Sequence, residues 1–109
     1  MTTGLNAIYA YFAAIRARDA DALGALFTDN AELVTTAGTF TGRDAIVGFY
    51  RDLAFQVEDL WPEPGPLLID GDRVAVEIAL RMNGATQRVA DIFTLGDGVI
   101  TRVAIYTRP

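Results

Sequence analysis

In this 109-residue chain, the clearest indication of the fold class is the segment Val74-Ala75-Val76-Glu77-Ile78-Ala79-Leu80-Arg81-Met82-Asn83-Gly84. Large apolar side chains at every second position alternate with small or charged ones, a pattern typical of a strand with one buried face. Asn83-Gly84 then predicts a tight hairpin turn, because both residues tolerate the positive φ angles that such turns need. An antiparallel partner strand is therefore expected directly after the turn.

The residues on both sides of this stretch extend the predicted sheet. Downstream, Arg88–Leu95 and Val99–Thr107 have strand composition and are separated by the turn residues Asp97-Gly98. Upstream, residues 54–60 are expected to form a short strand. The segment Trp61–Pro66 is expected to be a loop, because its three prolines do not fit a central strand.

The first half of the chain is expected to be mainly helical. An apolar stripe at spacings of three and four predicts a helix over residues 3–18, and Asp19 has the character of the N-cap of a short second helix. Residues 31–36 have an extended pattern, and a third helix is expected after Gly42. Helices gathered early and strands late predict a single α+β domain over residues 1–109.

Composition excludes several classes of function. Half of the chain is apolar (51%), the formal net charge is −5, and the nine basic residues are scattered. Without a basic patch, nucleic acid and anionic membranes are not expected partners. No basic leader or long apolar run is present, so a cytoplasmic protein is expected.

The chemistry open to the chain is also limited, because it has no cysteine and no histidine. These absences exclude Ser–His and Cys–His nucleophile pairs and the usual zinc ligand sets. Paired carboxylates such as Glu58 and Asp59 do not reproduce a known metal loop. We therefore expect no metal and no cofactor, and any catalysis must use carboxylates and phenols.

Asp91 is the most informative polar residue. Alternation along its strand places it on the same face as Val89, Phe93 and Leu95. If that face lines a pocket, burial favours the protonated acid, which can donate a hydrogen bond to a developing oxyanion. In the alternative interpretation, Asp91 faces solvent or pairs with Arg88 or Arg102.

Tyr11 is the second candidate, at one edge of the apolar stripe of the first helix. A tyrosine at such an edge can bury its ring while its hydroxyl group finds a polar partner. Taken alone, this position is compatible with an ordinary core residue as well as with a site residue.

Three segments give the chain a resemblance to a known superfamily. Ala17–Leu23, Thr41–Ile46 and Asp97–Ile100, in this order of elements, resemble the nuclear transport factor 2-like superfamily over residues 5–107. The resemblance implies a cone-shaped, curved antiparallel sheet packed against three helices from the N-terminal half, with a hydrophobic interior. The superfamily includes ketosteroid isomerases, SnoaL-like polyketide cyclases and proteins without catalytic activity, so fold alone does not give function.

The resemblance to ketosteroid isomerases also implies roles for individual residues. With Phe27–Ala31 and Gly42–Ile46 as anchors, Tyr11 matches the oxyanion-binding tyrosine of that family and Asp91 its protonated aspartic acid. Thr35 stands at the position of the family's general base, and a threonine hydroxyl cannot act as a base near neutral pH. Glu58 and Asp59 are possible substitutes, and both also have the character of solvated loop-edge charges.

These assignments predict a pocket, its ligand and two functions. The predicted ligand is a small hydrophobic carbonyl or phenolic compound, and the protein is expected to form a homodimer through the small residues of the outer sheet face. One function is a cofactor-independent isomerase-like or cyclase-like enzyme in which Tyr11 and Asp91 stabilise an enolate. The other is a non-catalytic ligand-binding or protein-association module. The predicted lining, besides Tyr11, Asp91 and Thr35, is Phe12, Leu33, Phe49, Leu53, Trp61, Val76, Ile78, Leu80, Phe93, Val103 and Ile105.

Overall fold

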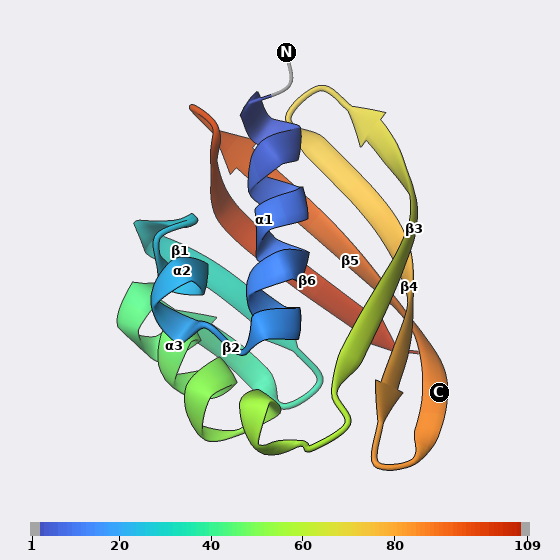
Figure 1. Cartoon of the computed structure of the whole chain (residues 1–109). Coiled ribbons are helices and arrows are strands. Elements are labelled where there is room, and N and C mark those ends of the chain that lie inside the picture. The colour runs from blue at the N-terminus through green and yellow to red at the C-terminus, as the bar shows by residue number, and fades with distance from the viewer. Residues whose placement is uncertain (1–2, 108–109) are drawn as a thin grey trace.

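The helices of the computed structural model, which describes residues 3–107, lie against one face of a curved six-stranded sheet (Figure 1). The helical elements are α1 (Thr3–Ala17), α2 (Ala20–Gly24), α3 (Arg43–Asp52) and the short 3-10 helix η1 (Ala54–Gln56). The carboxylate of Asp19 accepts a hydrogen bond from the Ala22 backbone N–H at 3.0 Å, which makes Asp19 the N-cap of α2 as predicted. No helix within residues 3–107 is long and apolar enough to cross a membrane.

The sheet has the strand order β2-β1-β6-β5-β4-β3. Its strands are β1 (Phe27–Thr35), β2 (Gly38–Thr41), β3 (Trp61–Asp70), β4 (Arg73–Met82), β5 (Ala85–Gly96) and β6 (Val99–Thr107). The predicted α+β cone is confirmed, and neighbouring strands are antiparallel except β1 and β6, which run parallel. The sheet is therefore mixed. Because β1 and β6 come from distant parts of the chain, no hairpin turn determines their relative direction.

Two local predictions before β4 are wrong. Residues 54–60 form η1 and further tight turns instead of a strand, with i→i+3 bonds such as Val57 N–H to Ala54 C=O at 3.1 Å. The predicted loop Trp61–Pro66 is the first half of β3. This strand lies at the edge of the sheet and its pairing is irregular between Pro64 and Leu67, so the missing proline N–H groups are tolerated.

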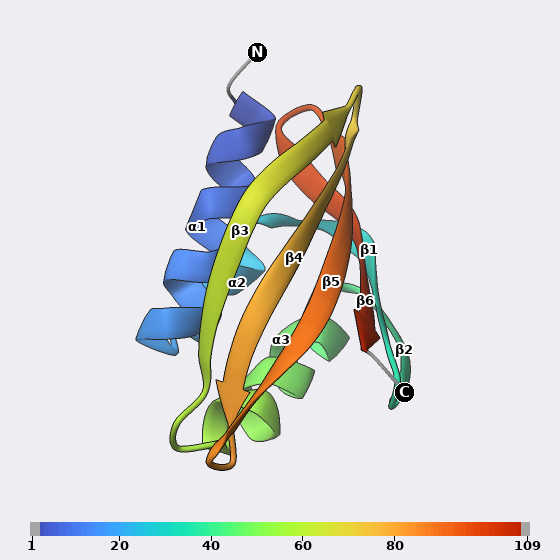
Figure 2. The same cartoon turned by 90° about the vertical axis from the view of Figure 1, so that its right-hand side faces the viewer.

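Helix α1 lies across the concave face of the sheet, and strands β3 to β6 curve along its side (Figure 2). The buried stripe of α1 packs on β5 through aromatic rings: the Phe93 ring centroid lies 5.1 Å from that of Tyr11 and 6.1 Å from that of Phe12. Such edge-to-face contacts stabilise the core beyond the burial of apolar area. Next to this aromatic cluster, a cavity lies between α1, α3 and the concave face of the sheet, and it is the candidate site.

Candidate functional site

A cavity of about 480 Å³ opens between α1, the α3–β3 connection and the concave face of the sheet. That volume is in the range of small-molecule binding sites. Its mouth is marked by exposed residues such as Thr36, Leu53 and Gln87. The complete lining consists of Tyr11, Phe12, Ile15, Thr35, Thr36, Ala37, Phe49, Tyr50, Leu53, Ala54, Val57, Leu60, Pro62, Ile78, Leu80, Met82, Gln87, Val89, Asp91, Ile105 and Thr107.

Two buried tyrosines form a pair in the cavity wall. The hydroxyl groups of Tyr11, on α1, and Tyr50, on α3, are hydrogen-bonded to each other. Both side chains are almost completely buried, and burial raises the pKa of each phenol well above its ordinary value. A charge on Asp91 would raise both pKa values further. The two hydroxyl groups are therefore neutral donors at physiological pH.

Asp91 brings a carboxyl group into this apolar environment. Its side chain on β5 is 3% exposed, and its Oδ1 atom is buried without a hydrogen-bond partner within residues 3–107. Desolvation by burial raises the pKa of Asp91 to about 7. Asp91 therefore does not face solvent, which was the alternative interpretation. It also does not pair with Arg102, because the Arg102 guanidinium pairs with Glu32 at 3.5 Å. At neutral pH the group can therefore donate as an acid or accept as a carboxylate.

Thr35 lines the cavity at the end of β1, but its hydroxyl group is used by the backbone turn that follows. It donates to the Gly38 carbonyl at 3.2 Å and accepts from the Ala37 N–H at 3.0 Å. Such local bonds are common where serine or threonine begins a turn. The residue that the resemblance predicts at the base position is thus a turn residue.

The two carboxylates considered as substitute bases do not line the cavity. The Asp59 carboxylate accepts hydrogen bonds from the backbone N–H groups of Asn83 and Gly84 at 2.7 and 2.8 Å. Both bonds lower the pKa of Asp59, and the bond from Gly84 has the larger effect. Asp59 thus stabilises the β4–β5 hairpin turn. The backbone carbonyl of Glu58 accepts a hydrogen bond from the Arg18 guanidinium at 2.8 Å.

The structure brings most of the predicted pocket residues together. Tyr11, Asp91 and Thr35 share the cavity with six of the predicted apolar residues: Phe12, Phe49, Leu53, Ile78, Leu80 and Ile105. Four others face inward but are fully buried in the core and do not reach the cavity: Leu33, Val76, Phe93 and Val103. Alternation identifies the inward face of a strand correctly, but it carries no information on position along the cone.

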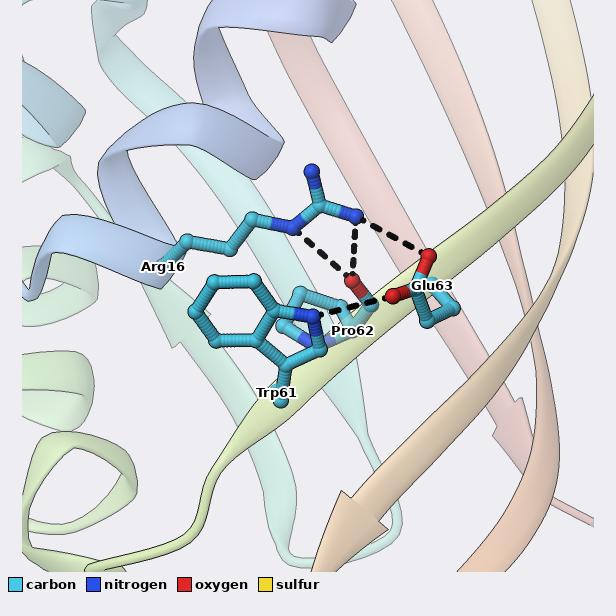
Figure 3. A network of polar contacts seen from close by, with 4 residues as sticks. All are labelled: Arg16, Trp61, Pro62 and Glu63. Carbon is cyan, nitrogen blue, oxygen red and sulfur yellow. Dashed lines mark hydrogen bonds and ion pairs between the residues drawn. The ribbon is translucent and has the colours of Figure 1, made fainter.

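Trp61 also differs from its predicted position, since it does not line the cavity. The Arg16 guanidinium lies over the Trp61 ring, 5.1 Å from the centroid (Figure 3). The indole Nε1–H of Trp61 donates to the Glu63 carboxylate at 3.0 Å. Arg16 also donates two hydrogen bonds to the Pro62 carbonyl, at 2.8 and 3.0 Å. These contacts fasten the start of β3 to α1 and place Pro62 in the cavity wall.

Tyr50 is the main site residue that sequence reasoning missed. Tyr50 belongs to the apolar stripe of the third predicted helix, together with Ile46, Phe49 and Leu53. The one indication of a polar role in the sequence was the hydroxyl group of a tyrosine in an otherwise apolar stripe. Its polar partner, Tyr11, lies 39 positions away in the chain. Among the described residues, no cluster of three or more potential metal ligands is present.

Comparisons with known proteins agree on the fold. A family model described as a SnoaL-like domain matches residues 8–103. The chain is similar to a candidate polyketide cyclase from Sinorhizobium meliloti (26% identity, TM-score 0.82, covering 92% of this chain and 93% of that one). A protein with a ketosteroid isomerase-like fold from Catenulispora acidiphila, in complex with trimethylamine, is 25% identical, with a TM-score of 0.81. The match covers 92% of this chain and 83% of that one. A candidate ketosteroid isomerase from Kribbella flavida has a TM-score of 0.87 at 20% identity, and the match covers 98% of this chain and 78% of that one. No curated protein matches the chain.

Proposed function

The chain belongs to the SnoaL-like domain family, and on this premise we propose that it binds a small hydrophobic carbonyl compound and stabilises the enolate formed from it, as a cyclase-like or isomerase-like enzyme. The observation that carries the proposal is the unpartnered, buried Asp91 carboxyl group in the same cavity as the Tyr11–Tyr50 pair. An ordinary core would not keep an unsatisfied acid at this depth.

The roles of the three residues follow from their hydrogen-bonding capacity. When Tyr50 donates to Tyr11, the hydroxyl proton of Tyr11 is free to bind an oxyanion, and the first bond strengthens the second. Protonated Asp91 supplies another donor from the facing sheet. Donors held in place before the reaction stabilise developing negative charge more than water does, and each can account for a rate factor of about 10²–10³.

The lack of a base limits the type of substrate. No carboxylate other than Asp91 lines the cavity within residues 3–107, and the Thr35 hydroxyl is engaged in a turn. A carbon flanked by two carbonyl groups loses its proton to water or buffer far more readily than a simple ketone does. We therefore place the substrate among such dicarbonyl compounds, in which the enolate can attack a second carbonyl of the same molecule. The similarity to a candidate polyketide cyclase at 26% identity supports this class.

Replacement of Asp91 by asparagine tests the proposed donor. Asp91→Asn is expected to keep the fold and to weaken the binding of naphthol, a fluorescent phenol, by roughly three- to tenfold, because an amide is a poorer donor than a neutral acid. Fluorescence titration measures the dissociation constant, and Asp70→Asn on an exposed strand end is the matched control. Unchanged affinity in Asp91→Asn would place Asp91 outside the binding site.

A second candidate function is a ligand-binding or protein-association module without turnover. The engagement of the Thr35 hydroxyl in the turn favours it, because the residue that the resemblance predicts at the base position cannot act as a general base. The two functions differ in one observable. A module binds carbonyl compounds stoichiometrically and releases them unchanged, whereas an enzyme converts many equivalents of a dicarbonyl substrate.

We also propose a homodimer formed through the outer face of the sheet. On this face, paired residues of three strands form a row of apolar side chains that are at least partly exposed: Leu68, Ala75 and Ile92. Leu68 is 69% exposed, and Tyr106 nearby on β6 is 54% exposed. Sedimentation equilibrium is expected to give twice the chain mass of 11.8 kDa, and Ile92→Arg is expected to give the single mass. A wild-type monomer at high concentration would remove the proposal.

A further inference from the structure

Among the residues that the structure describes, one side chain determines the charge of the cavity. Within residues 3–107, the ionisable groups that line it are Asp91, Tyr11 and Tyr50. Burial raises the pKa of both phenols, so they are neutral at physiological pH. None of the described arginines lines the cavity. Of the described residues, ionised Asp91 would thus be the one that brings a charge into contact with a ligand.

The described parts of the neighbouring elements offer Asp91 no counter-charge. Its cross-strand neighbours are Val76 on β4 and Ile105 on β6, both apolar. The helices facing it contribute the two neutral phenols, and its Oδ1 atom has no partner within the described chain. Burying an unpaired carboxyl group costs stability, and its missing partner therefore points to a ligand.

Aromatic rings line the same cavity as Asp91. They belong to Tyr11 and Phe12 on α1 and to Phe49 and Tyr50 on α3. The faces of such rings attract cations, and the attraction is stronger where water is excluded. A cationic ligand would find a carboxylate and several rings, whereas an anionic ligand would find no counter-charge.

The charge of the whole chain acts in the same direction. The formal net charge is −5, from 14 acidic and nine basic residues. Such a field raises the local concentration of cations and repels anions as they approach. Ligands that arrive with a negative charge are therefore disfavoured before they reach the cavity.

From these observations we propose that the cavity binds a hydrophobic amine in its protonated form. An ammonium N–H donates to the Asp91 carboxylate, and the ring system of the ligand packs against the apolar wall formed by side chains such as Leu60, Ile78 and Val89. The inference goes beyond the proposed function, because it uses Asp91 as an ionised acceptor, whereas enolate stabilisation uses it as a protonated donor.

Three naphthalene probes of similar shape test the inference on the full chain: naphthylmethylamine, naphthalenemethanol and naphthoate, which are cationic, neutral and anionic at neutral pH. The amine is expected to bind roughly ten- to a hundredfold more tightly than the alcohol, since its N–H bond is to a charged acceptor. Naphthoate is expected to bind more weakly than the amine. Equal affinity for the amine and the alcohol would overturn the inference.

Asp91→Asn separates this inference from the proposed function. The variant keeps a donor of similar shape but loses the charge in the cavity, so it is expected to lose most of the preference for the amine over the alcohol. Naphthol binding is expected to fall only three- to tenfold in the same variant, and Asp70→Asn is expected to change neither. An amine preference of undiminished size in Asp91→Asn would contradict the inference, whatever happens to naphthol.

Proton release provides a measurement that needs no variant. Because the pKa of Asp91 is raised to about 7, amine binding to the wild type at pH 7 is expected to release about half a proton, and alcohol binding none. Calorimetry in two buffers of different ionisation enthalpy measures this number. Uptake of a proton on amine binding would overturn the inference, because the ligand would then favour the protonated form of Asp91. Loss of acidity-dependent naphthol binding, with amine binding intact, would overturn the proposed function alone.

Discussion

Thr35→Asp is expected to raise the rate at which the protein isomerises a β,γ-unsaturated ketosteroid by about 10²–10⁴-fold, the usual contribution of a positioned general base. Thr35 lines the cavity that holds Tyr11 and Asp91, and its inward position on β1 is where the family resemblance places the base. A carboxylate there can still accept from the Ala37 N–H through one oxygen, as the threonine hydroxyl does at 3.0 Å. Its other oxygen cannot donate to Gly38 and is left free for the substrate.

Two matched variants control this experiment. Thr35→Asn has nearly the same shape as the aspartate variant without its basicity, and Thr39→Asp introduces the same charge at an exposed position of β2 outside the cavity. Both are expected to remain at the wild-type rate in the absorbance assay for the conjugated product. If Thr35→Asp folds and its rate equals that of Thr35→Asn, the assignment of the base position is wrong.

Asp91→Asn is expected to make the protein more stable at high pH, by up to about 4 kcal/mol, because the pKa of Asp91 rises from 3.8 to about 7 on folding. Between these values the folded state holds a proton that the unfolded state has lost. The wild type is therefore penalised progressively as the pH rises from about 4 to about 7, and fully above that range. The amide has no such titration.

Denaturant unfolding at a series of pH values measures this effect. The free energy of unfolding of Asp91→Asn minus that of the wild type is expected to increase between pH 4 and pH 7 and to be constant above pH 8. Asp70→Asn, at an exposed position, is the control for charge loss alone. A difference that does not vary with pH would mean that Asp91 titrates as it does in the unfolded chain.

Local patterns were sufficient for the elements whose neighbours are close in the chain. The stripe of α1, the alternation of β4 and the Asn83-Gly84 turn each follow from the spacing of a few residues, and they were predicted correctly. The same alternation put Asp91 on the inward face, where it is 3% exposed. Its burial could be inferred because strand geometry allows only two faces.

Features that depend on distant contacts could not be read from local patterns. Residues 55–58 turn instead of forming a strand, and their carbonyls accept hydrogen bonds from Arg18, which is 37 or more positions away. Pro62 and Pro64 are compatible with an edge strand as well as with a loop, and only the assembled sheet distinguishes the two. The Tyr11–Tyr50 bond likewise joins two helices whose relative position follows from the curvature of the sheet.

Titration with naphthols of graded acidity shows whether Tyr11 and Asp91 form an oxyanion-binding site. The measurement compares wild type, Tyr11→Phe and, as control on the same helix, Tyr9→Phe, whose side chain is 59% exposed. We expect affinity to increase with naphthol acidity in the wild type and in Tyr9→Phe. In Tyr11→Phe we expect it to fall by about tenfold for the most acidic naphthol, through loss of a hydrogen bond to a charged oxygen. Affinity that depends neither on naphthol acidity nor on Tyr11 would contradict the account and leave an apolar cavity without an oxyanion site.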